Sequence, residues 1–517
     1  MGLVENEVED AERFNEIIHV LADEGLGIIL DELDLTHRLP ASKKLKRNKE
    51  PGPERLRETF EELGPTFIKF GQILAERPDI MPEEYTGELE NLQDDVPGFD
   101  SEKAKEIVDE EVGLENFQEF EEEHIAAASI AQVHRATLKS GEEVVVKIRR
   151  PEIKEEVTTD LEILEFLAKR GVKRSDRLSD MQLLKSVKEF SRWTREELNL
   201  KKEARNGERL SENLSDQEGI KIPEMYTDLT TEKVLVMEYI DGVKVSNLEA
   251  LEELEIDPKE VATNAMKGGL KQILRDGFFH ADPHQSNFLI QEEGNLVLID
   301  FGMMGRISDD QRKDLGLLIL HMLREDTEKA LDDLKRIGHV QDDADLNYIK
   351  TKLEEKNRLL QNASIGEESL TEQVIELTIE SSRHGIVMPQ SLILAGKAMV
   401  TVEGVGMTIY PDYRIGDEFK ETVRNILQEE FKPEKLMEEL SLDMIENRDL
   451  ITELPSKLNS MAEKKESQVK VVNQQRTQAV TAALILSSAF LLTQGRTTLT
   501  LLGAAEILLA AHLFHQE

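Results

Sequence analysis

The sequence predicts an α+β protein in which a small β-rich region lies between two helical regions. Apolar side chains recur at intervals of three and four over residues 54–75, as they do in amphipathic helices. Residues 131–149 and 233–242 contain short runs that are rich in β-branched side chains and end in turn signals, as strands do. Helical periodicity then continues over residues 306–476, and no internal repeat interrupts this order.

Composition and charge exclude several classes of protein. The chain has 517 residues, which is enough for two or three domains or for one large domain with extensions. Its 64 basic and 105 acidic residues give a formal net charge of −41, so we expect no nucleic-acid partner. The acids are dispersed, which is typical of a solvated surface, and adaptation to a salt-rich cytoplasm is a second interpretation. Because the chain has no cysteine, disulfides and thiolate metal sites are excluded.

The N-terminal region is expected to be a helical extension. Helical spacing runs from Leu56 to Phe70 and is interrupted by Gly64 and Pro65. A second helix is predicted over residues 81–97, because one proline stands in its first turn and another closes it. The first fourteen residues lack the basic start and apolar core of a signal peptide, so an intracellular protein is expected.

The rest of the chain is expected to form two lobes and a C-terminal extension. A strand, a tight turn and a second strand are predicted over residues 131–149, then helices over 151–215 and an apolar strand at 233–242. A hairpin is predicted over residues 287–302. The expected regions are a helical extension at 1–111, a small lobe at 112–240, a helical lobe at 241–450, a linker helix at 451–476 and an apolar helical hairpin at 477–517.

Two carboxylates and an amide stand at fixed spacing beside the apolar runs of the predicted hairpin. Asp282 is followed five residues later by Asn287, and Asp300 then opens an Asp-Phe-Gly segment. Hard oxygen ligands suit Mg²⁺, and this order is that of the catalytic Asp, the Asn and the metal-binding Asp of kinases. The Asp–Asn spacing alone is a weak signal. Together with the Asp-Phe-Gly segment and an upstream strand lysine, it predicts a site for Mg²⁺ and phosphates.

The upstream lysine is Lys147, at the end of a Val-Val-Val run. Strand alternation places it on the same face as Val145, where a cation needs a counter-charge or a phosphate. Glu203, on a following helix, is the candidate partner. Taken alone, Lys147 would be a snorkelling surface lysine and Glu203 part of a solvated helix face. Their combination with the downstream motif favours an ion pair.

His280 and His284 flank Asp282 and allow an alternative chemistry. Two imidazoles and a carboxylate are suitable zinc ligands. However, Pro283 breaks the helix that this spacing normally uses, and the local spacing shows no further His or Cys ligand. The favoured interpretation is that the histidines brace the loop through hydrogen bonds, with zinc as the alternative.

A run of small residues stands where a kinase would have its glycine-rich loop. Alanine is the next smallest choice, but its Cβ restricts positive φ and close approach of the backbone to phosphates. Taken alone, an alanine run is a packing surface with high helix propensity. Before the Lys147 strand, we interpret it as an altered nucleotide loop, consisting of Ala126, Ala127, Ala128, Ser129 and Ile130.

The C-terminal end contains two apolar segments. Residues 477–495 are nineteen residues without a charge, which span roughly 28 Å as a helix. A second apolar segment follows Arg496, and its Glu506 is costly in lipid. Membrane insertion is favoured, with the large domain on the cytoplasmic face because basic residues precede the first segment. The alternative is a soluble helical hairpin that packs on the main domain or on a second copy of the chain.

Across residues 54–310 the chain resembles the UbiB family of atypical kinases, also called aarF-domain kinases. The resemblance implies a two-lobed protein-kinase-like fold with an N-terminal helical extension that carries a Lys-x-Gly-Gln motif. Seven motifs occur in order, which makes it specific. They are "FIKFGQILAERPDIMPEEYTGELENLQDDVP", "AAASIAQVHRA", "VVVKIRRP", "EELNLKKEARN", "VLVMEYIDG", "FFHADPHQSN" and "LIDFG".

The resemblance implies roles for the candidate residues. Lys147 and Glu203 would form the ion pair that orients the nucleotide phosphates. Asp282 would be the catalytic residue, and Asn287 and Asp300 would hold Mg²⁺. The hinge from Glu238 to Ile240 would bind adenine through its main chain.

The Lys-x-Gly-Gln motif corresponds to Lys69, Gly71 and Gln72, on a helix that folds over the active site where a peptide substrate would lie. Lys69 would reach Glu197. Two positions depart from the family pattern. Asn199 replaces an Asp, which weakens the expected charge pairing with Lys69, and Ser286 replaces a Gly in the catalytic loop.

The implied cofactors are ATP and Mg²⁺. The implied activity is slow ATP hydrolysis or phosphate transfer to an unidentified acceptor, in support of isoprenoid-quinone (ubiquinone) biosynthesis or lipid metabolism at the membrane. Expected partners are membrane lipid or isoprenoid-quinone precursors, proteins of a biosynthetic complex and a second copy of the chain. The alternative is a catalytically weak, nucleotide-dependent scaffold or a lipid chaperone.

Overall fold

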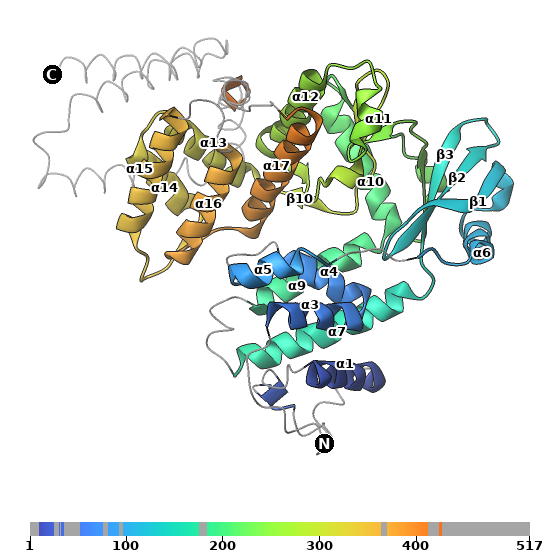
Figure 1. Ribbon diagram of the computed structural model, residues 1–517, viewed down its shortest axis with the longest axis horizontal. Helices are drawn as coiled ribbons and strands as arrows, with labels where there is room; N and C mark the ends of the chain where they lie inside the picture. Colours follow the sequence, from blue (N-terminus) through green and yellow to red (C-terminus); the bar gives the residue numbers. More distant parts are fainter. Residues whose placement is uncertain are drawn as a thin grey trace, which may run out of the picture. The chain divides into compact units, whose positions relative to one another are not determined.

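The computed structural model describes residues 10–24, 30–31, 33–35, 52–75, 81–92, 97–174, 183–362, 370–411 and 423–425. These residues form helices and mostly antiparallel sheets (Figure 1), which confirms the predicted α+β class. The predicted linker helix and apolar hairpin at residues 451–517 lie outside the described part of the chain.

The N-terminal helices share one core with helices that come later in the sequence. Phe14, Phe60, Phe70 and Phe190 meet in this core. At the predicted interruption, Gly64 has a φ of +98°, a value that suits glycine, and Pro65 begins the next helix. The helices of this helical core, all visible in Figure 1, are α1 (Ala11–Asp23), α3 (Pro53–Leu63), α4 (Pro65–Ala75), α5 (Glu83–Leu89), α7 (Ile153–Val172) and α9 (Leu183–Glu197).

A four-stranded antiparallel sheet forms the small lobe. Its strands in order are β1 (Phe117–Ala127), β2 (Ala131–Leu138), β3 (Glu143–Arg149) and β5 (Val234–Glu238). Val144, Val146 and Ile148 lie in a core with α6 (Ser101–Glu111), so the alternation predicted for this strand is correct. Strand β1 was not predicted from the sequence, because the run of exposed glutamates in β1 lacks the apolar alternation of a strand.

The sheets of the second lobe are small. Strands β4 (Ile220–Lys221), β9 (Leu296–Leu298), β8 (Phe288–Ile290) and β6 (Val243–Lys244) pair in that order, and β7 (Phe278–His280) pairs with β10 (Met304–Arg306). The predicted hairpin is confirmed: β8 and β9 are antiparallel, and Gly294 makes the turn with a φ of +83°.

Helices make up most of the second lobe. They are α10 (Leu200–Leu214), α11 (Leu248–Glu252), α12 (Pro258–Leu270), α13 (Asp309–Leu323), α14 (Thr327–Ile337), α15 (Leu346–Asn362), α16 (Leu370–Arg383) and α17 (Gln390–Ile409). A π-helical turn, η4 (Lys271–Arg275), extends α12, and a short ladder joins β11 (His339–Val340) to β12 (Ile386–Val387). Among the described residues, α17 alone is long and apolar enough to cross a membrane. However, it packs on α12 and α16 as a core helix does.

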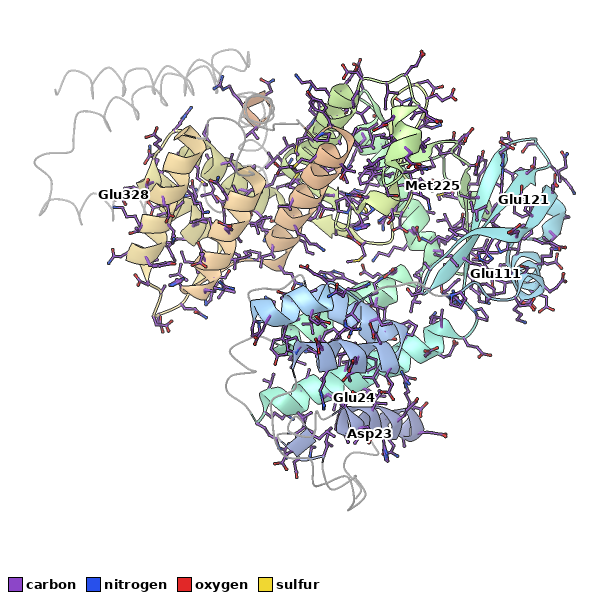
Figure 2. All side chains as sticks on the ribbon, in the orientation of Figure 1. Asp23, Glu24, Glu111, Glu121, Met225 and Glu328 are labelled. Atoms are coloured by element: carbon purple, nitrogen blue, oxygen red, sulfur yellow. The ribbon has the colours of Figure 1, made fainter. Side chains whose placement is uncertain are left out.

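The acidic excess is dispersed over the surface of the described residues. Asp23 on α1, Glu121 on β1 and Glu328 on α14 are all exposed and lie on separate elements (Figure 2). This distribution fits the interpretation of a solvated surface.

Candidate nucleotide-binding site

Lys147 is the centre of a buried ion cluster that joins the two lobes. Its Nζ donates to Glu203 Oε1 at 2.7 Å and to Asp300 Oδ2 at 2.8 Å. These partners lie 56 and 153 positions away in the sequence. The Glu203 side chain is 1% exposed and that of Asp300 is 36% exposed. The cluster is therefore closed on the Glu203 side and open on the Asp300 side.

The electrostatics of the cluster differ between its two carboxylates. Burial raises the pKa of Glu203 to about 7, although the Lys147 charge opposes this rise. Burial also acts to raise the pKa of Asp300, but the Lys147 charge, the hydrogen bonds from Lys147 and Gly302, and the nearby His280 together outweigh it, so the net pKa is well below the ordinary value. Glu203 Oε2 is buried without a hydrogen-bond partner. Glu203 is therefore the carboxyl that takes up a proton first as the pH falls.

Helix α10 holds Glu203 and the Asp-Phe-Gly segment together. Asn199 begins the helix: its side chain accepts from the Lys202 amide at 3.2 Å, as an N-cap does. One turn after Glu203, the Asn206 side-chain amide donates to the Phe301 carbonyl at 3.0 Å. Asn206 was not among the site residues predicted from the sequence. A polar residue three positions after Glu203 lies on the same helix face, which was the available signal.

Phe301 packs closely against the same helix. Its side chain is fully buried, and a Cβ at Gly207 would come within 3.2 Å of the phenyl ring and within 2.4 Å of the Met225 methyl group. The absence of a side chain at position 207 lets Phe301 and Met225 approach α10. This contact fixes the residue that follows Asp300.

His280 connects the catalytic loop with the Asp-Phe-Gly segment. Its Nδ1 accepts from the Asp282 amide at 3.1 Å, and its Nε2 lies 2.8 Å from the Asp300 carbonyl. Because Nδ1 is an acceptor, Nε2 carries the proton and donates to that carbonyl. Both ring nitrogens therefore bond to protein, which is the bracing role favoured over zinc. His284 lies within 3.3 Å of the Ser286 hydroxyl.

The β8–β9 hairpin brings Asn287 and Asp300 to the same end of the small sheet. The Ile299 amide donates to the Asn287 carbonyl at 3.1 Å, so the residues that flank the hairpin are adjacent. The Asn287 Nδ2 donates to the Asp282 carbonyl at 3.1 Å, which leaves its Oδ1 for another ligand. Among the described residues, no hydrogen bond or ion pair engages the Asp282 carboxylate.

The oxygen atoms of Asn287 and Asp300 suit a divalent cation such as Mg²⁺. The Asn287 Oδ1 and the Asp300 carboxylate are hard oxygen ligands, and two protein ligands are enough for an ion that retains several waters. Asp300 is held in place because its Oδ1 accepts from the Gly302 amide at 3.0 Å. The residues predicted as metal ligands therefore fit the group that they are predicted to hold.

The predicted nucleotide loop is a tight turn between β1 and β2. The Ala128 amide donates to the Ala131 carbonyl at 2.8 Å, and the Ala128 carbonyl accepts from Arg150 Nε at 2.9 Å. Ile130 packs in the helical core described above. Of the five predicted loop residues, Ala126, Ala127 and Ala128 are at least partly exposed, whereas Ser129 and Ile130 are buried.

The predicted hinge follows β5. The Glu238 amide donates to the Glu224 carbonyl at 2.8 Å, and the Glu238 carboxylate pairs with Lys221 at 2.5 Å. The Tyr239 amide donates to the Glu143 carbonyl at 3.0 Å. These bonds fix the end of the strand. The main-chain groups predicted to bind adenine are the Glu238 carbonyl and the Ile240 amide.

The Lys-x-Gly-Gln helix α4 reaches the site through Lys69. The Lys69 ammonium pairs with the Glu197 carboxylate, and both side chains are largely buried. A Cβ at Gly302 would lie 3.3 Å from Glu197 Cγ, so the pair rests against the Asp-Phe-Gly segment. Gln72 instead donates to the Leu92 carbonyl at 3.2 Å.

Gly71 allows the Lys-x-Gly-Gln helix to pack closely on its neighbours. A Cβ at this position would come within 2.4 Å of Leu92 and 2.5 Å of Phe60. Residues of α3 and of the segment after α5 therefore occupy the space that a side chain would need. The motif thus combines one ionic contact, one hydrogen bond and one close helix contact.

Asn199 does not contact Lys69 among the described residues. Its side chain caps α10, and its Nδ2 lies 3.4 Å from Glu232 Oε1. The departure from Asp that the sequence analysis associated with Lys69 therefore has a local structural role. Arg149, another residue that the sequence analysis missed, holds this junction because its Nη1 donates to the Leu198 carbonyl at 2.6 Å.

Comparisons with known proteins agree with this architecture. Residues 91–334 match the ABC1 atypical kinase-like domain, and residues 360–414 match the UbiB helical domain. These matches confirm the kinase-like fold with a helical C-terminal region that the sequence predicted. A complex of Rv3197 with erythromycin from Mycobacterium tuberculosis has a similar fold, with a TM-score of 0.50, 20% identity, and coverage of 72% of this chain and 93% of that chain.

Several relatives are similar over most of this chain. ACTIVITY OF BC1 COMPLEX KINASE 7 of Arabidopsis thaliana, a chloroplastic protein, is 32% identical over 79% of this chain, which spans 60% of that protein's length. A probable protein kinase UbiB of Azotobacter vinelandii is 31% identical over 76% of this chain and 75% of the relative. A Clostridium pasteurianum protein encoded in the hydrogenase 1 5′ region is 36% identical, with coverage of 78% and 74%.

Proposed function

The chain belongs to the ABC1/UbiB family of atypical kinase-like proteins, and we propose that it binds ATP with Mg²⁺ and hydrolyses it or transfers its terminal phosphate. One observation carries this proposal. Lys147, Glu203 and Asp300 converge from three distant segments, and His280 links Asp300 to the Asp282 main chain. Among the described residues, the Asp282 carboxylate and the Asn287 Oδ1 have no hydrogen-bond partner. A buried ion pair with a purely structural role needs no such unpaired oxygen ligands nearby.

Each residue of the cluster has a role in this proposal. Lys147 orients the phosphates, and Glu203 holds the lysine side chain in place. Asn287, through its Oδ1, and Asp300 are the residues that would hold Mg²⁺. When bound, the metal ion neutralises negative charge on the phosphate oxygens. The Glu238 carbonyl and the Ile240 amide bind the adenine edge.

Asp282 orients the attacking hydroxyl or water and accepts its proton. His280 fixes the main chain of this residue through the Asp282 amide, and Asp282 itself is partly exposed. The acceptor is small or is water, because Lys69 holds helix α4 to Glu197, whose side chain lies against Gly302, and this restricts access for a peptide.

We further propose that the reaction supports isoprenoid-quinone or lipid metabolism at a membrane. The similarity to a UbiB protein supports this assignment. The uncharged stretch at residues 477–495 supports the membrane contact. The expected partners are membrane lipid or quinone precursors, proteins of a biosynthetic complex and a second copy of the chain.

A nucleotide-dependent scaffold or lipid chaperone is the second candidate function. It is favoured by the loop between β1 and β2, where the Ala128 amide already donates to Ala131 and Ile130 packs in the helical core. Such a loop offers fewer free amides to phosphates than a glycine-rich loop does. Tight nucleotide binding without turnover is the signature of this function.

Two measurements on purified full-length protein test the proposal. Asp300→Asn is expected to lose Mg²⁺-dependent ATP binding by about tenfold or more, because an amide is a weaker ligand than a carboxylate. Asp282→Asn is expected to retain binding and to lose ATP hydrolysis, measured with and without liposomes. Asp343→Asn, at an exposed acid, is the matched control. Wild-type binding without hydrolysis in either condition supports the scaffold instead.

A further inference from the structure

The helix that precedes the catalytic loop does not end as a regular α-helix. After α12 the chain makes the π-helical turn η4, in which the Asp276 amide donates to the Lys271 carbonyl, five residues back, at 3.0 Å. A π-helical turn is rare and occurs frequently at functional sites. Strand β7, which leads into the catalytic loop, begins three residues after η4. The chain therefore enters the catalytic loop directly from an irregular turn.

The start of this turn is tied to helix α10. The Lys271 side chain is 8% exposed, and its ammonium pairs with Asp216 at 3.0 Å and with Asp276 at 3.3 Å. It also donates to the Asn213 carbonyl in the last turn of α10. Because α10 also contacts the Asp-Phe-Gly segment, the π-helical turn is held to the same helix as the proposed metal-binding segment.

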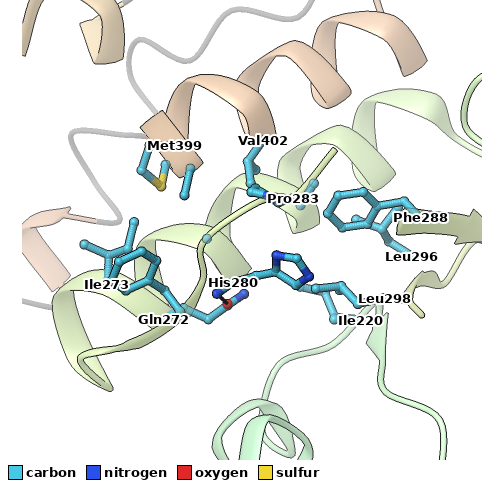
Figure 3. Close-up of a pocket in the computed structure, with 14 residues that line it drawn as sticks. Ile220, Gln272, Ile273, His280, Pro283, Phe288, Leu296, Leu298, Met399 and Val402 are labelled. Carbon is cyan, nitrogen blue, oxygen red and sulfur yellow. Dashed lines mark hydrogen bonds between the residues drawn. The ribbon is translucent and has the colours of Figure 1, made fainter. Parts of the chain in front are cut away.

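Gln272, the second residue of the turn, is a buried polar side chain among apolar ones. It is 6% exposed. Figure 3 shows it with His280 in a small pocket whose other lining residues are apolar. Burying an amide among such residues costs free energy unless the amide forms hydrogen bonds. An apolar side chain would fill this space without that cost, so the glutamine is expected to have a specific polar partner.

The partner is the main chain of His280. Gln272 Oε1 accepts from the His280 amide at 3.0 Å. The imidazole of the same residue accepts from the Asp282 amide through Nδ1 and donates to the Asp300 carbonyl through Nε2. Gln272 therefore fixes the residue that holds both acidic residues of the proposed site. These three bonds end on main-chain groups, so they set the position of the two carboxylates without engaging them.

We propose that Gln272 is a positioning residue of the nucleotide site, because its bond to the His280 amide sets where the imidazole holds Asp282 and Asp300. The proposal rests on the proposed function, since it assigns Gln272 a part in the same reaction. Proton acceptance by Asp282 and metal binding by Asp300 both require closely placed oxygen atoms. Loss of the bond therefore lowers the reaction rate and the Mg²⁺ affinity, and leaves the adenine contacts of the hinge unchanged.

A purely structural role for Gln272 would have different consequences. In either role, removal of the acceptor leaves the His280 amide unpaired in the interior and lowers stability. Stability therefore does not distinguish the two roles. Kinetics and metal affinity do, because a structural role affects them only through the fraction of folded protein.

Gln272→Met tests the positioning role in purified full-length protein. Methionine has nearly the shape of glutamine and removes the acceptor. The kcat for hydrolysis of Mg²⁺–ATP is expected to fall about tenfold, and the Mg²⁺ affinity at saturating ATP about threefold. The Kd for adenosine, which reports the hinge contacts alone, is expected to stay within about twofold of the wild-type value.

Two further variants accompany this test. Gln272→Glu keeps an acceptor oxygen for the His280 amide, so its kcat is expected to stay within about threefold of the wild-type value. Gln373→Met is the matched control. Gln373 is a glutamine that is 2% exposed on α16, a helix that carries no residue of the proposed site. This variant is expected to keep both kcat and Mg²⁺ affinity.

Amide hydrogen exchange checks that the bond itself is lost. Exchange in the peptide that spans residues 278–284 is expected to be about tenfold faster in Gln272→Met than in the wild type, and unchanged in Gln272→Glu. If Gln272→Met does not fold, Gln272→Asn makes the same comparisons, because its shorter side chain withdraws the oxygen by one methylene group.

Other results overturn the proposal. Equal kcat and Mg²⁺ affinity in Gln272→Met and an active wild type remove the role of Gln272 and leave the proposed function standing. A Gln272→Glu variant that is as impaired as Gln272→Met also contradicts the proposal, since it separates activity from the acceptor oxygen. A wild type that neither binds nor hydrolyses ATP overturns the proposed function, and the role of Gln272 with it.

Discussion

The Lys147 ammonium donates to the Asp300 carboxylate across 2.8 Å, and this contact links β3 of the small lobe to the segment after β9. In the proposed function both residues face the nucleotide, the first towards phosphate and the second towards the metal ion. In the proposed function, Asp300 would hold the divalent cation and Lys147 would gain a phosphate partner.

The first prediction concerns Lys147. Lys147→Met removes the counter-charge of two carboxylates, so it is expected to weaken ATP binding and to lower the free energy of unfolding by about 1–3 kcal/mol. The loss is expected to be smaller in acid than at neutral pH, because Glu203 can take up a proton. Urea denaturation and nucleotide titration measure both effects. A loss of stability that is independent of pH contradicts the assignment of the proton to Glu203.

A second prediction concerns the restraint on the Asp-Phe-Gly segment. Lys69→Met breaks the pair with Glu197, which rests against Gly302, and is expected to raise basal ATP hydrolysis about threefold or more by freeing that segment. Lys105→Met breaks an exposed pair with Glu122 and is the matched control. Lower hydrolysis in Lys69→Met would show that the pair supports the site instead of restraining it.

A third prediction distinguishes the two interpretations of Asn199. Because its side chain caps α10, Asn199→Ala is expected to cost about 1 kcal/mol of stability, whereas Asn199→Asp keeps the cap. The aspartate would lose the amide contact with Glu232 and add a like charge, so a small net loss is expected. Thermal unfolding of both variants measures the difference. A gain in stability in Asn199→Asp that disappears in Lys69→Met would instead indicate charge pairing with Lys69.

The fourth prediction is a pH dependence set by His134. This side chain is 0% exposed, accepts from Gln132 through Nε2, and donates from Nδ1 to the Glu121 carbonyl. Burial holds its pKa below the ordinary value of 6.5, although the bond to Glu121 opposes this. Because the unfolded chain binds this proton more readily, stability is expected to fall as the pH drops below about 6.5. The network also includes the Phe99 amide, which donates to Gln132.

His134→Gln provides the comparison for this pH dependence. The variant loses the titrating group, so its free energy of unfolding is expected to be lower at neutral pH and to change less between about pH 7 and pH 5 than that of the wild type. Urea denaturation at a series of pH values measures both curves. Parallel curves would show that other groups set the acid sensitivity.

The sequence by itself determined the parts of the site that depend on local chain geometry. Asp282, Asn287 and Asp300 lie on either side of one hairpin, and an antiparallel pair returns the chain to its starting point whatever the rest of the fold does. Strand alternation likewise placed Lys147 opposite the core face. Short-range spacing predicts these positions because the backbone geometry of a strand or hairpin fixes where side chains a few residues apart lie.

Only the tertiary structure decided which distant groups meet. Any of the 105 acidic residues is chemically able to pair with Lys147, and packing of α10 against β5 and Phe301 selects Glu203. The same packing brings Asn206 to the Phe301 carbonyl. Packing among the N-terminal helices likewise decides that Ile130 lies in the helical core. Contacts between distant segments depend on the summed packing of many side chains, which no local pattern in the sequence records.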